Sequence, residues 1–282
     1  MRKILSYGII SVMILAVLGA GTLFVRKKAG AKNSTAYQMV FLGDSLFGQI
    51  RDETSVSTRV GELLGLSAFN GCFGGTDAAR IASDQGLSPQ KGLLSLDALA
   101  VAVTTGEFGA QRTLRIRENG TAHFSATIEE LSAIDLKQAD ILVLEYGTND
   151  YFDGVPLYNE ENPLDGYSFY GALKGAIQRI QHKYPDIRIL MVSPTYHWIT
   201  SQGQTCEQWN AGGGLLAEYV AVEQQVAQET GIEFLDIYHD FYPHETWEEY
   251  LTYTLDGVHP NDAGREKIAG KIAEYLTETG KE

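Results

Sequence analysis

The sequence predicts an α/β fold in which a mainly parallel sheet carries helices on both faces. Short apolar runs of strand length alternate with longer segments whose apolar residues recur at helical spacing. Two of the runs end abruptly at Gly43 and Gly147, in turns rich in Gly, Asp and Asn. Such alternation implies right-handed crossovers, which place the carboxyl ends of all strands at one edge. Ligands of open α/β sheets bind at that edge.

The first predicted strand begins at Gln38 and ends in Gly43-Asp44-Ser45-Leu46. It therefore brings a serine to the carboxyl edge of the sheet. Alone, this tetrapeptide is weak support for catalysis, because Asp and Ser also form turns and helix N-caps. A helix is expected from Thr54 to Leu64, ended by Gly65, and a short strand follows from Ser67 to Asn70.

A glycine-rich turn, Asn70 to Asp77, opens into a predicted helix that starts at Ala78. Glycine clusters mark tight turns, and they also expose backbone N–H groups that can bind an oxyanion. The insertion between Leu87 and Leu136 is long for a crossover, and we expect it to cover or wall the site. Its helices are expected at 93–103, 108–117 and 125–131.

A second apolar strand begins at Asp140 and ends in Gly147-Thr148-Asn149-Asp150, so Asn149 and Asp150 should reach the same edge as Ser45. In isolation, an Asn-Asp pair is most simply a turn. The alternation then continues with a helix at 169–184, a strand at 188–193, a helix at 211–230, a strand at 233–236 and a helix at 262–276.

A serine hydroxyl becomes a good nucleophile only when a base takes its proton, so a catalytic serine requires a histidine and a carboxylate. Asp256-Gly257-Val258-His259 supplies both. Pro260 disfavours helix at His259, so the carboxylate shares a loop with the imidazole and can reach its Nδ1, leaving Nε2 free. The simpler interpretation of a lone Asp-His loop is a surface turn. Of the other histidines, His197 is the one expected near the site, and the rest lack an equivalent setting: His123, His182, His239 and His244.

In this order, four segments resemble the four sequence blocks of the SGNH, or GDSL, hydrolases. They are Gly43-Asp44-Ser45-Leu46, the glycine turn at 70–76, Gly147-Thr148-Asn149-Asp150 and Asp256-Gly257-Val258-His259. The resemblance covers nearly all of residues 38–276. It implies a flavodoxin-like three-layer α/β/α sandwich with a mainly parallel five-stranded sheet. The absence of a Gly-x-Ser-x-Gly sequence argues against the α/β-hydrolase fold.

Carried over to this chain, the resemblance makes Ser45 the nucleophile, His259 the general base and Asp256 the residue that orients it. It implies no metal or other cofactor. The implied oxyanion hole consists of the Ser45 N–H, the Asn149 side-chain amide and a glycine N–H, for which Gly74 is the best match while Gly71 and Gly75 stay open.

The amino-terminal stretch is predicted to be a membrane segment. Residues 4–25 contain no charge and twelve Leu, Ile, Val or Phe side chains, enough to span a bilayer core as a helix. We therefore divide the chain into an anchor or signal segment at 1–28, a linker at 29–36 and one hydrolase domain at 37–282. An uncleaved single-pass anchor with an extracytoplasmic domain is expected, and secretion after cleavage is the alternative.

The composition limits the classes of molecule that the chain is expected to bind. The chain has 22 basic and 36 acidic residues, and five of the basic ones flank the apolar stretch, which leaves 17 against 36 elsewhere. Such a surface repels nucleic acid. Cys72 and Cys206 permit one disulfide without requiring it, and free buried thiols are the simpler expectation.

These observations predict a membrane-tethered serine esterase acting on small-molecule or glycan esters, with O-acetyl groups on cell-surface glycans preferred. An O-acyltransferase using the same triad, or a non-catalytic binding module, are the alternatives. The oligomeric state is not predicted. Aromatic rings near strand ends can stack on sugars, although packing is the commoner role. The residues expected to contact substrate are Asp44, Asp150, Tyr151, Tyr196 and His197.

Overall fold

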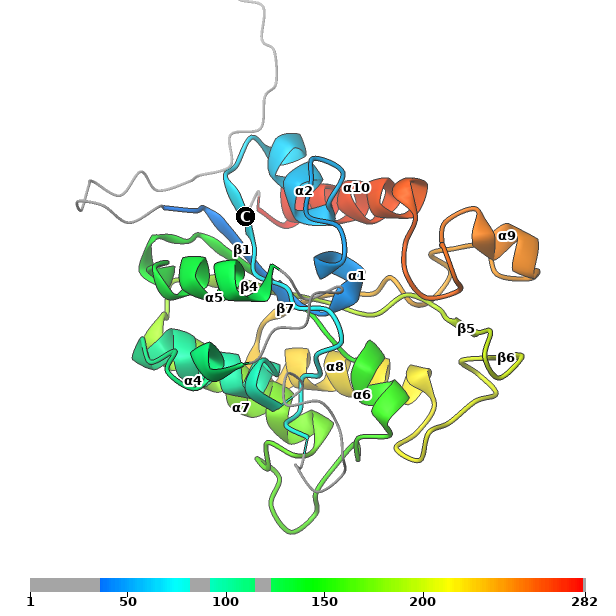
Figure 1. Cartoon of the computed structure of the whole chain (residues 1–282), viewed down its shortest axis with the longest axis horizontal. Coiled ribbons are helices and arrows are strands. Elements are labelled where there is room, and N and C mark those ends of the chain that lie inside the picture. The colour runs from blue at the N-terminus through cyan, green and yellow to red at the C-terminus, as the bar shows by residue number, and fades with distance from the viewer. Residues whose placement is uncertain (1–35, 82–91, 115–122, 281–282) are drawn as a thin grey trace, which may run out of the picture.

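A five-stranded parallel sheet forms the centre of the molecule (Figure 1). The computed structural model describes residues 36–81, 92–114 and 123–280. The strand order is β2-β1-β3-β4-β7, and every neighbouring pair is parallel. The strands are β1 (Met39–Gly43), β2 (Ala68–Asn70), β3 (Ile141–Glu145), β4 (Arg188–Val192) and β7 (Glu233–Leu235). The expected fold class is confirmed.

The sequences of the central strands are continuous apolar runs because helices cover both faces of these strands. Every residue of β1 and β3 is buried, as expected for parallel strands packed between two helix layers. Gly43 pairs with Glu145, and Glu145 pairs with Val192. Because these strand ends are level, the segments that follow them emerge side by side at one edge.

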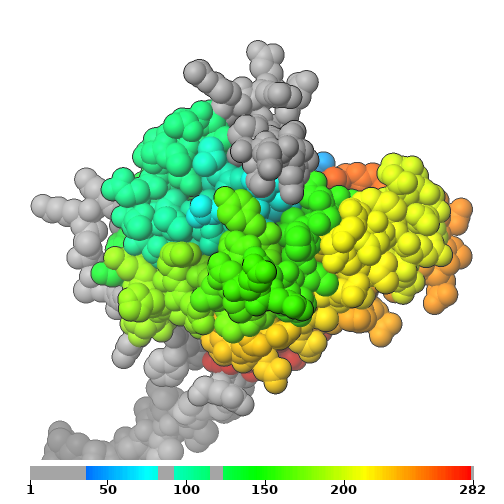
Figure 2. All heavy atoms as spheres, turned by 90° about the horizontal axis from the view of Figure 1, so that it is seen from below, coloured from blue at the N-terminus to red at the C-terminus, as the bar shows by residue number. Residues whose placement is uncertain are grey.

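Helices cover both faces of the sheet (Figure 1). On the first face, α2 (Val56–Leu64) packs against α10 (Asp262–Thr279). On the second, α7 packs against both α4 and α8. The described helices of this second face are α4 (Leu96–Thr105), α5 (Phe124–Ser132), α7 (Phe169–Lys183) and α8 (Leu216–Thr230). Figure 2, seen from the α4 side, shows α4 (teal), residues around 150–165 (green) and residues around 200–215 (yellow) forming one continuous surface.

Local chemistry sets the helix ends. The Ser55 side chain accepts from the Thr58 N–H at the start of α2, and Gly65 ends that helix in the left-handed conformation. The expected start of α8 at residue 211 is wrong, because Gly212 and Gly214 have φ values of 121° and 154°, outside the helical region.

The helix expected to start at Ala78 does not form in the described part of that segment. The N–H groups of Ala78 and Ala79 donate instead to the Asp150 carboxylate, and the Arg80 N–H donates to the Gly166 carbonyl. These contacts hold the chain as an irregular loop. In the insertion, the helix expected at 108–117 is reduced, within the described residues, to the 3₁₀ turn η2 (Gln111–Thr113).

Several short elements were not predicted. They are α1 (Ser45–Gly48), α6 (Thr148–Asp153), α9 (Trp247–Leu251), η3 (Leu136–Gln138) and the antiparallel pair β5 (Trp198–Ile199) and β6 (Gln204–Thr205). Most of them lie at the carboxyl edge of the sheet, where they shape the site described below.

The predicted anchor at 1–28 and all but the last residue of the linker lie outside the described residues. Within the described ranges, no helix is both long enough and apolar enough to cross a membrane. Cys72 and Cys206 are both buried and free, so no disulfide joins them.

Candidate active site

Ser45 is the first residue of α1 and follows directly from β1. Asp44 caps this short helix, because its Oδ1 accepts the Leu46 N–H at 2.8 Å. Glycine is required just before this turn, since a Cβ at Gly43 would lie 2.7 Å from the Glu145 carbonyl oxygen. The close approach of β1 and β3 thus fixes where the serine leaves the sheet.

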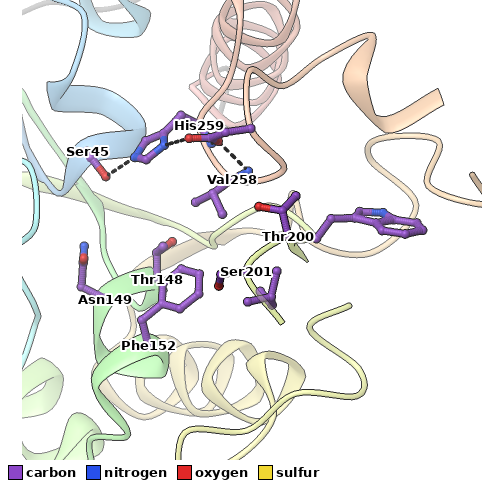
Figure 3. A pocket seen from close by; sticks show the side chains of 11 residues that line it. Ser45, Thr148, Asn149, Phe152, Thr200, Ser201, Val258 and His259 are labelled. Atoms are coloured by element: carbon purple, nitrogen blue, oxygen red, sulfur yellow. Dashed lines mark hydrogen bonds and ion pairs between the residues drawn. The ribbon is translucent and has the colours of Figure 1, made fainter. Parts of the chain in front are cut away.

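The loop before α10 brings His259 to Ser45 across 214 residues of sequence (Figure 3). Nε2 of His259 lies 3.0 Å from Ser45 Oγ, and Nδ1 lies 2.8 Å from Asp256 Oδ2. The other carboxylate oxygen of Asp256 accepts the N–H groups of Val258 and His259 at 3.0 and 2.8 Å. The sequence-predicted serine, histidine and aspartate therefore meet in hydrogen-bonding geometry.

The Asp256 carboxylate fixes the tautomer of the imidazole. Partial burial favours a higher pKa for Asp256, but the hydrogen bonds from His259 and Val258 outweigh it, and the pKa lies below its ordinary value. The ionised carboxylate can only accept, so Nδ1 of His259 carries the proton. Nε2 is then free to accept the hydroxyl proton of Ser45.

The N–H groups expected to form the oxyanion hole are those of Ser45, a glycine of the turn after β2, and the Asn149 amide. Gly74 packs against the serine, since a Cβ at Gly74 would lie 3.6 Å from Ser45 Cβ. Within the described part of the chain, the backbone N–H groups of Ser45 and Gly74 have no hydrogen-bond acceptor. The Gly71 N–H, by contrast, donates to the Phe41 carbonyl at 2.8 Å and is not available.

Asn149 is held firmly beside this position. Its Nδ2 donates to Asp44 Oδ2 and to the Thr76 carbonyl, both at 3.1 Å. One amide group thus joins the ends of β1 and β3 to the glycine turn after β2.

Buried carboxyl groups lie behind the serine. Burial raises the pKa of Asp44 to about 6, although hydrogen bonds to its carboxylate oppose this shift. Burial and the neighbouring Asp44 raise the pKa of Glu145 well above its usual range. Burial likewise raises the pKa of Asp150 to about 7 and that of Glu223 well above its usual range.

A pocket of about 270 Å³ opens next to Ser45 and His259 (Figure 3). None of the described residues between 92 and 136 lines it, and the described helices there, α4 and α5, lie over one face of the sheet. One wall comes from α6 and the other from the β5–β6 hairpin and the Asp256 loop. The lining residues besides Ser45 and His259 are Thr148, Asn149, Phe152, Trp198, Ile199, Thr200, Ser201, Asp256 and Val258.

The five residues expected to contact substrate are almost fully buried and do not line this pocket. Asp44 and Asp150 instead accept backbone N–H groups. The Tyr151 hydroxyl donates to the Trp209 carbonyl. Tyr196 stacks on the ring of His244, and His197 contacts the Thr148 hydroxyl. Their position in this structure supports structural roles.

Sequence reasoning missed most of the pocket wall. Phe152 lies one turn after Asn149, so its helical spacing was a usable signal. Ile199, Thr200 and Ser201 belong to a hairpin of two-residue strands, which is too short to produce a periodic pattern.

The structure also corrects the interpretation of His239. Its Nδ1 lies 2.7 Å from Asp236 Oδ2, and Asp236 Oδ1 accepts the N–H groups of Tyr238 and His239 at 2.8 and 3.0 Å. This Asp-x-x-His turn repeats the hydrogen bonds of the Asp256 turn. It differs in that, among the described residues, no serine hydroxyl bonds its Nε2.

No group of three or more His, Cys, Asp or Glu side chains in the described ranges is arranged to hold a metal ion. The donors at the site are instead a hydroxyl, an imidazole, an amide and backbone N–H groups. They suit the activation of a serine and the stabilisation of an oxyanion.

Residues 41–267 match the GDSL-like Lipase/Acylhydrolase family, and the chain belongs to this family. It is therefore an enzyme of the ester-hydrolysing class. No curated protein matches the sequence at a significant level.

Solved structures share the fold. A protein from Lactobacillus plantarum is 20% identical, with 87% of this chain and 99% of that chain covered and a TM-score of 0.61. A possible lipase from Chitinophaga pinensis is 18% identical, with 86% and 99% covered and a TM-score of 0.56. A carbohydrate acetylesterase family member from Sinorhizobium meliloti is 16% identical, with 85% and 97% covered and a TM-score of 0.50.

Proposed function

We propose that the protein is a serine esterase in which Ser45, His259 and Asp256 act as a catalytic triad. The observation that carries this proposal is the 3.0 Å contact between His259 Nε2 and Ser45 Oγ, combined with the Asp256 carboxylate on Nδ1. Each group has the protonation state that its role requires, since Nε2 accepts and Nδ1 donates.

The reaction proceeds in two steps. Ser45 Oγ attacks the ester carbonyl carbon while His259 takes the hydroxyl proton. Collapse of the tetrahedral intermediate breaks the bond to the alcohol oxygen, which receives that proton from His259. Water then attacks the acyl-enzyme, gives a proton to His259 and releases the acid, and the proton returns to Ser45 Oγ.

The oxyanion of each intermediate is stabilised by the N–H groups of Ser45 and Gly74 and by the Asn149 amide. The Asn149 N–H that now donates to the neutral Thr76 carbonyl is shared with the oxyanion, because a charged acceptor forms the stronger hydrogen bond. Asp44 keeps the amide in place during this exchange.

An acetyl ester on a glycan is the substrate that we favour, with the chain tethered to the membrane through residues 1–28 and its domain outside the cytoplasm. The small pocket with hydroxyl and aromatic walls supports this choice. The structural likeness to a carbohydrate acetylesterase family member gives it further support.

The decisive experiment uses the full-length chain with 4-nitrophenyl acetate and a fluorophosphonate probe. We expect turnover, and one probe molecule on Ser45. Ser45→Ala should lose both, whereas Ser201→Ala, which changes another serine of the same pocket, should keep the label. Activity that survives in Ser45→Ala would exclude the nucleophile assignment. Failure of the probe to label the native chain would favour the binding module.

Two further measurements address the remaining alternatives. If added sugar acceptors divert the acyl group from water, the enzyme is an acyltransferase. If the full-length chain is found in the soluble fraction after cell lysis, or as a shortened secreted form, the proposed anchor is excluded.

A further inference from the structure

Thr148 is a pocket residue whose hydroxyl group is held from behind. Its Oγ1 lies 3.2 Å from Nε2 of His197, a fully buried ring that stacks on Phe152 at 6.0 Å between centroids. Thr148 is 2% exposed, and its remaining exposed surface lines the pocket next to Asn149. Figure 3 shows its side chain directed into the pocket, between Phe152 and Val258.

The direction of the Thr148–His197 hydrogen bond follows from the surroundings of the ring. Nδ1 of His197 lies 3.1 Å from the Tyr196 carbonyl, which can only accept, so Nδ1 carries a proton. Burial lowers the pKa of His197 to about 3, so the ring is neutral and Nε2 has no proton. Thr148 must therefore donate its single proton to His197. Its oxygen then keeps only lone pairs for a further partner.

The pocket lies on the side of the site where the alcohol part of an ester would sit. In the proposed reaction, His259 gives its proton to the leaving alcohol oxygen, so that oxygen must be next to the imidazole. His259 and its neighbour Val258 line the same pocket as Thr148. An alcohol that leaves next to His259 therefore enters the pocket that Thr148 also lines.

We propose that Thr148, oriented by His197, is a specificity-determining residue that accepts a hydrogen bond from a second hydroxyl group of the substrate alcohol. The substrate class is therefore an ester of a polyol such as a sugar, rather than of a simple alcohol. This inference rests on the proposed function, because the role of His259 defines the alcohol side. An alcohol without a second hydroxyl leaves the Thr148 oxygen facing a group that cannot donate.

The test compares two esters of one sugar in the full-length enzyme. One is methyl 3-O-acetyl-α-glucopyranoside, with free neighbouring hydroxyls, and the other is its 2,4,6-tri-O-methyl derivative. Acetate release gives kcat/KM for each, and their ratio cancels any general loss of active enzyme. The wild type should favour the free sugar about three- to tenfold, the range of one hydrogen bond. Thr148→Val should bring the ratio close to one, and Thr148→Ser, which keeps the hydroxyl, should retain it.

A wild-type ratio near one would overturn the proposal without any variant being needed. A ratio that is unchanged in Thr148→Val would overturn it as well. Failure of the proposed function gives a different result. In that case acetate release would be equal in Ser45→Ala and the wild type, which would remove the assignment of the alcohol side together with the triad.

Discussion

Replacing Asp256 by asparagine tests the tautomer argument directly. In the native turn, Oδ1 accepts two backbone N–H groups, and Oδ2 faces Nδ1 of His259. An asparagine side chain has one oxygen, and the two N–H groups will hold it. Its NH₂ group then faces Nδ1 and donates to it, so the proton of the ring moves to Nε2. The imidazole can no longer accept the proton of Ser45.

The expected loss is large and at most that of a fully enforced wrong tautomer. A fully enforced wrong tautomer costs about 10⁴ in kcat. The Asp256 side chain is 53% exposed, so water can replace part of its support to the ring. We therefore expect kcat for 4-nitrophenyl acetate to fall about 10²- to 10⁴-fold, or about 3–5 kcal/mol in activation free energy.

The chain provides a matched control in Asp236→Asn. That change alters an Asp-x-x-His turn with the same hydrogen bonds and no bonded serine in the described structure, so turnover should stay at the wild-type level. If kcat of Asp256→Asn stays within tenfold of the wild-type value, the tautomer argument is refuted. An equal loss in Asp236→Asn would show that the effect is not specific to the site.

Three other predictions concern the oxyanion hole, the loop and the buried carboxyls. Asn149→Ala should lower kcat about 10²- to 10³-fold with little change in KM, and a loss confined to KM would contradict its role. Gly257 has a φ of 93°, and a Cβ there would clash with the Trp198 carbonyl. Gly257→Ala should therefore reduce both turnover and the urea midpoint of unfolding. Gly65→Ala is the control, because Gly65 has a φ of 66° and open space around it. It should lower the free energy of unfolding by about 1 kcal/mol and leave turnover unchanged. Equal turnover in Gly257→Ala and Gly65→Ala would argue against a clash at Gly257. Burial raises the pKa of Asp150 in the native state to about 7. Between about pH 4 and 7 the native state therefore holds a proton that the unfolded state has released, and the free energy of unfolding falls as pH rises through this range. The urea midpoint should therefore be higher at pH 5.5 than at pH 7.5, and Asp150→Asn should flatten this slope; an unchanged slope would exclude Asp150 as its source.

The sheet was predictable because its central strands are long apolar runs that end in polar turns. Residues 39–43 and 141–145 show this pattern clearly. The spacing of Asp256 and His259 was equally clear, since the carboxylate bonds the backbone and ring of its own turn. These are local signals, which a single sequence contains.

Other features depend on contacts between distant segments and were missed for that reason. The loop at Ala78 is irregular because its N–H groups bond Asp150, which is more than seventy residues away. The Asp236 and Asp256 turns have the same local geometry, and only the path of the chain brings Ser45 to one of them. Local pattern therefore predicts the turn, whereas topology decides which turn has a nucleophile.

The two halves of the site are anchored unequally. Asn149 is joined to the ends of two other chain segments through Asp44 and Thr76, inside the protein. The Asp256 carboxylate is half exposed and bonds N–H groups of its own turn, and the Trp198 N–H joins that turn to β5 through the Gly257 carbonyl at 2.9 Å. Gradual warming should therefore displace the imidazole while the anion-binding half is still intact. Inactivation would then begin at temperatures where the sheet has not yet melted, and cooling would restore the enzyme without refolding.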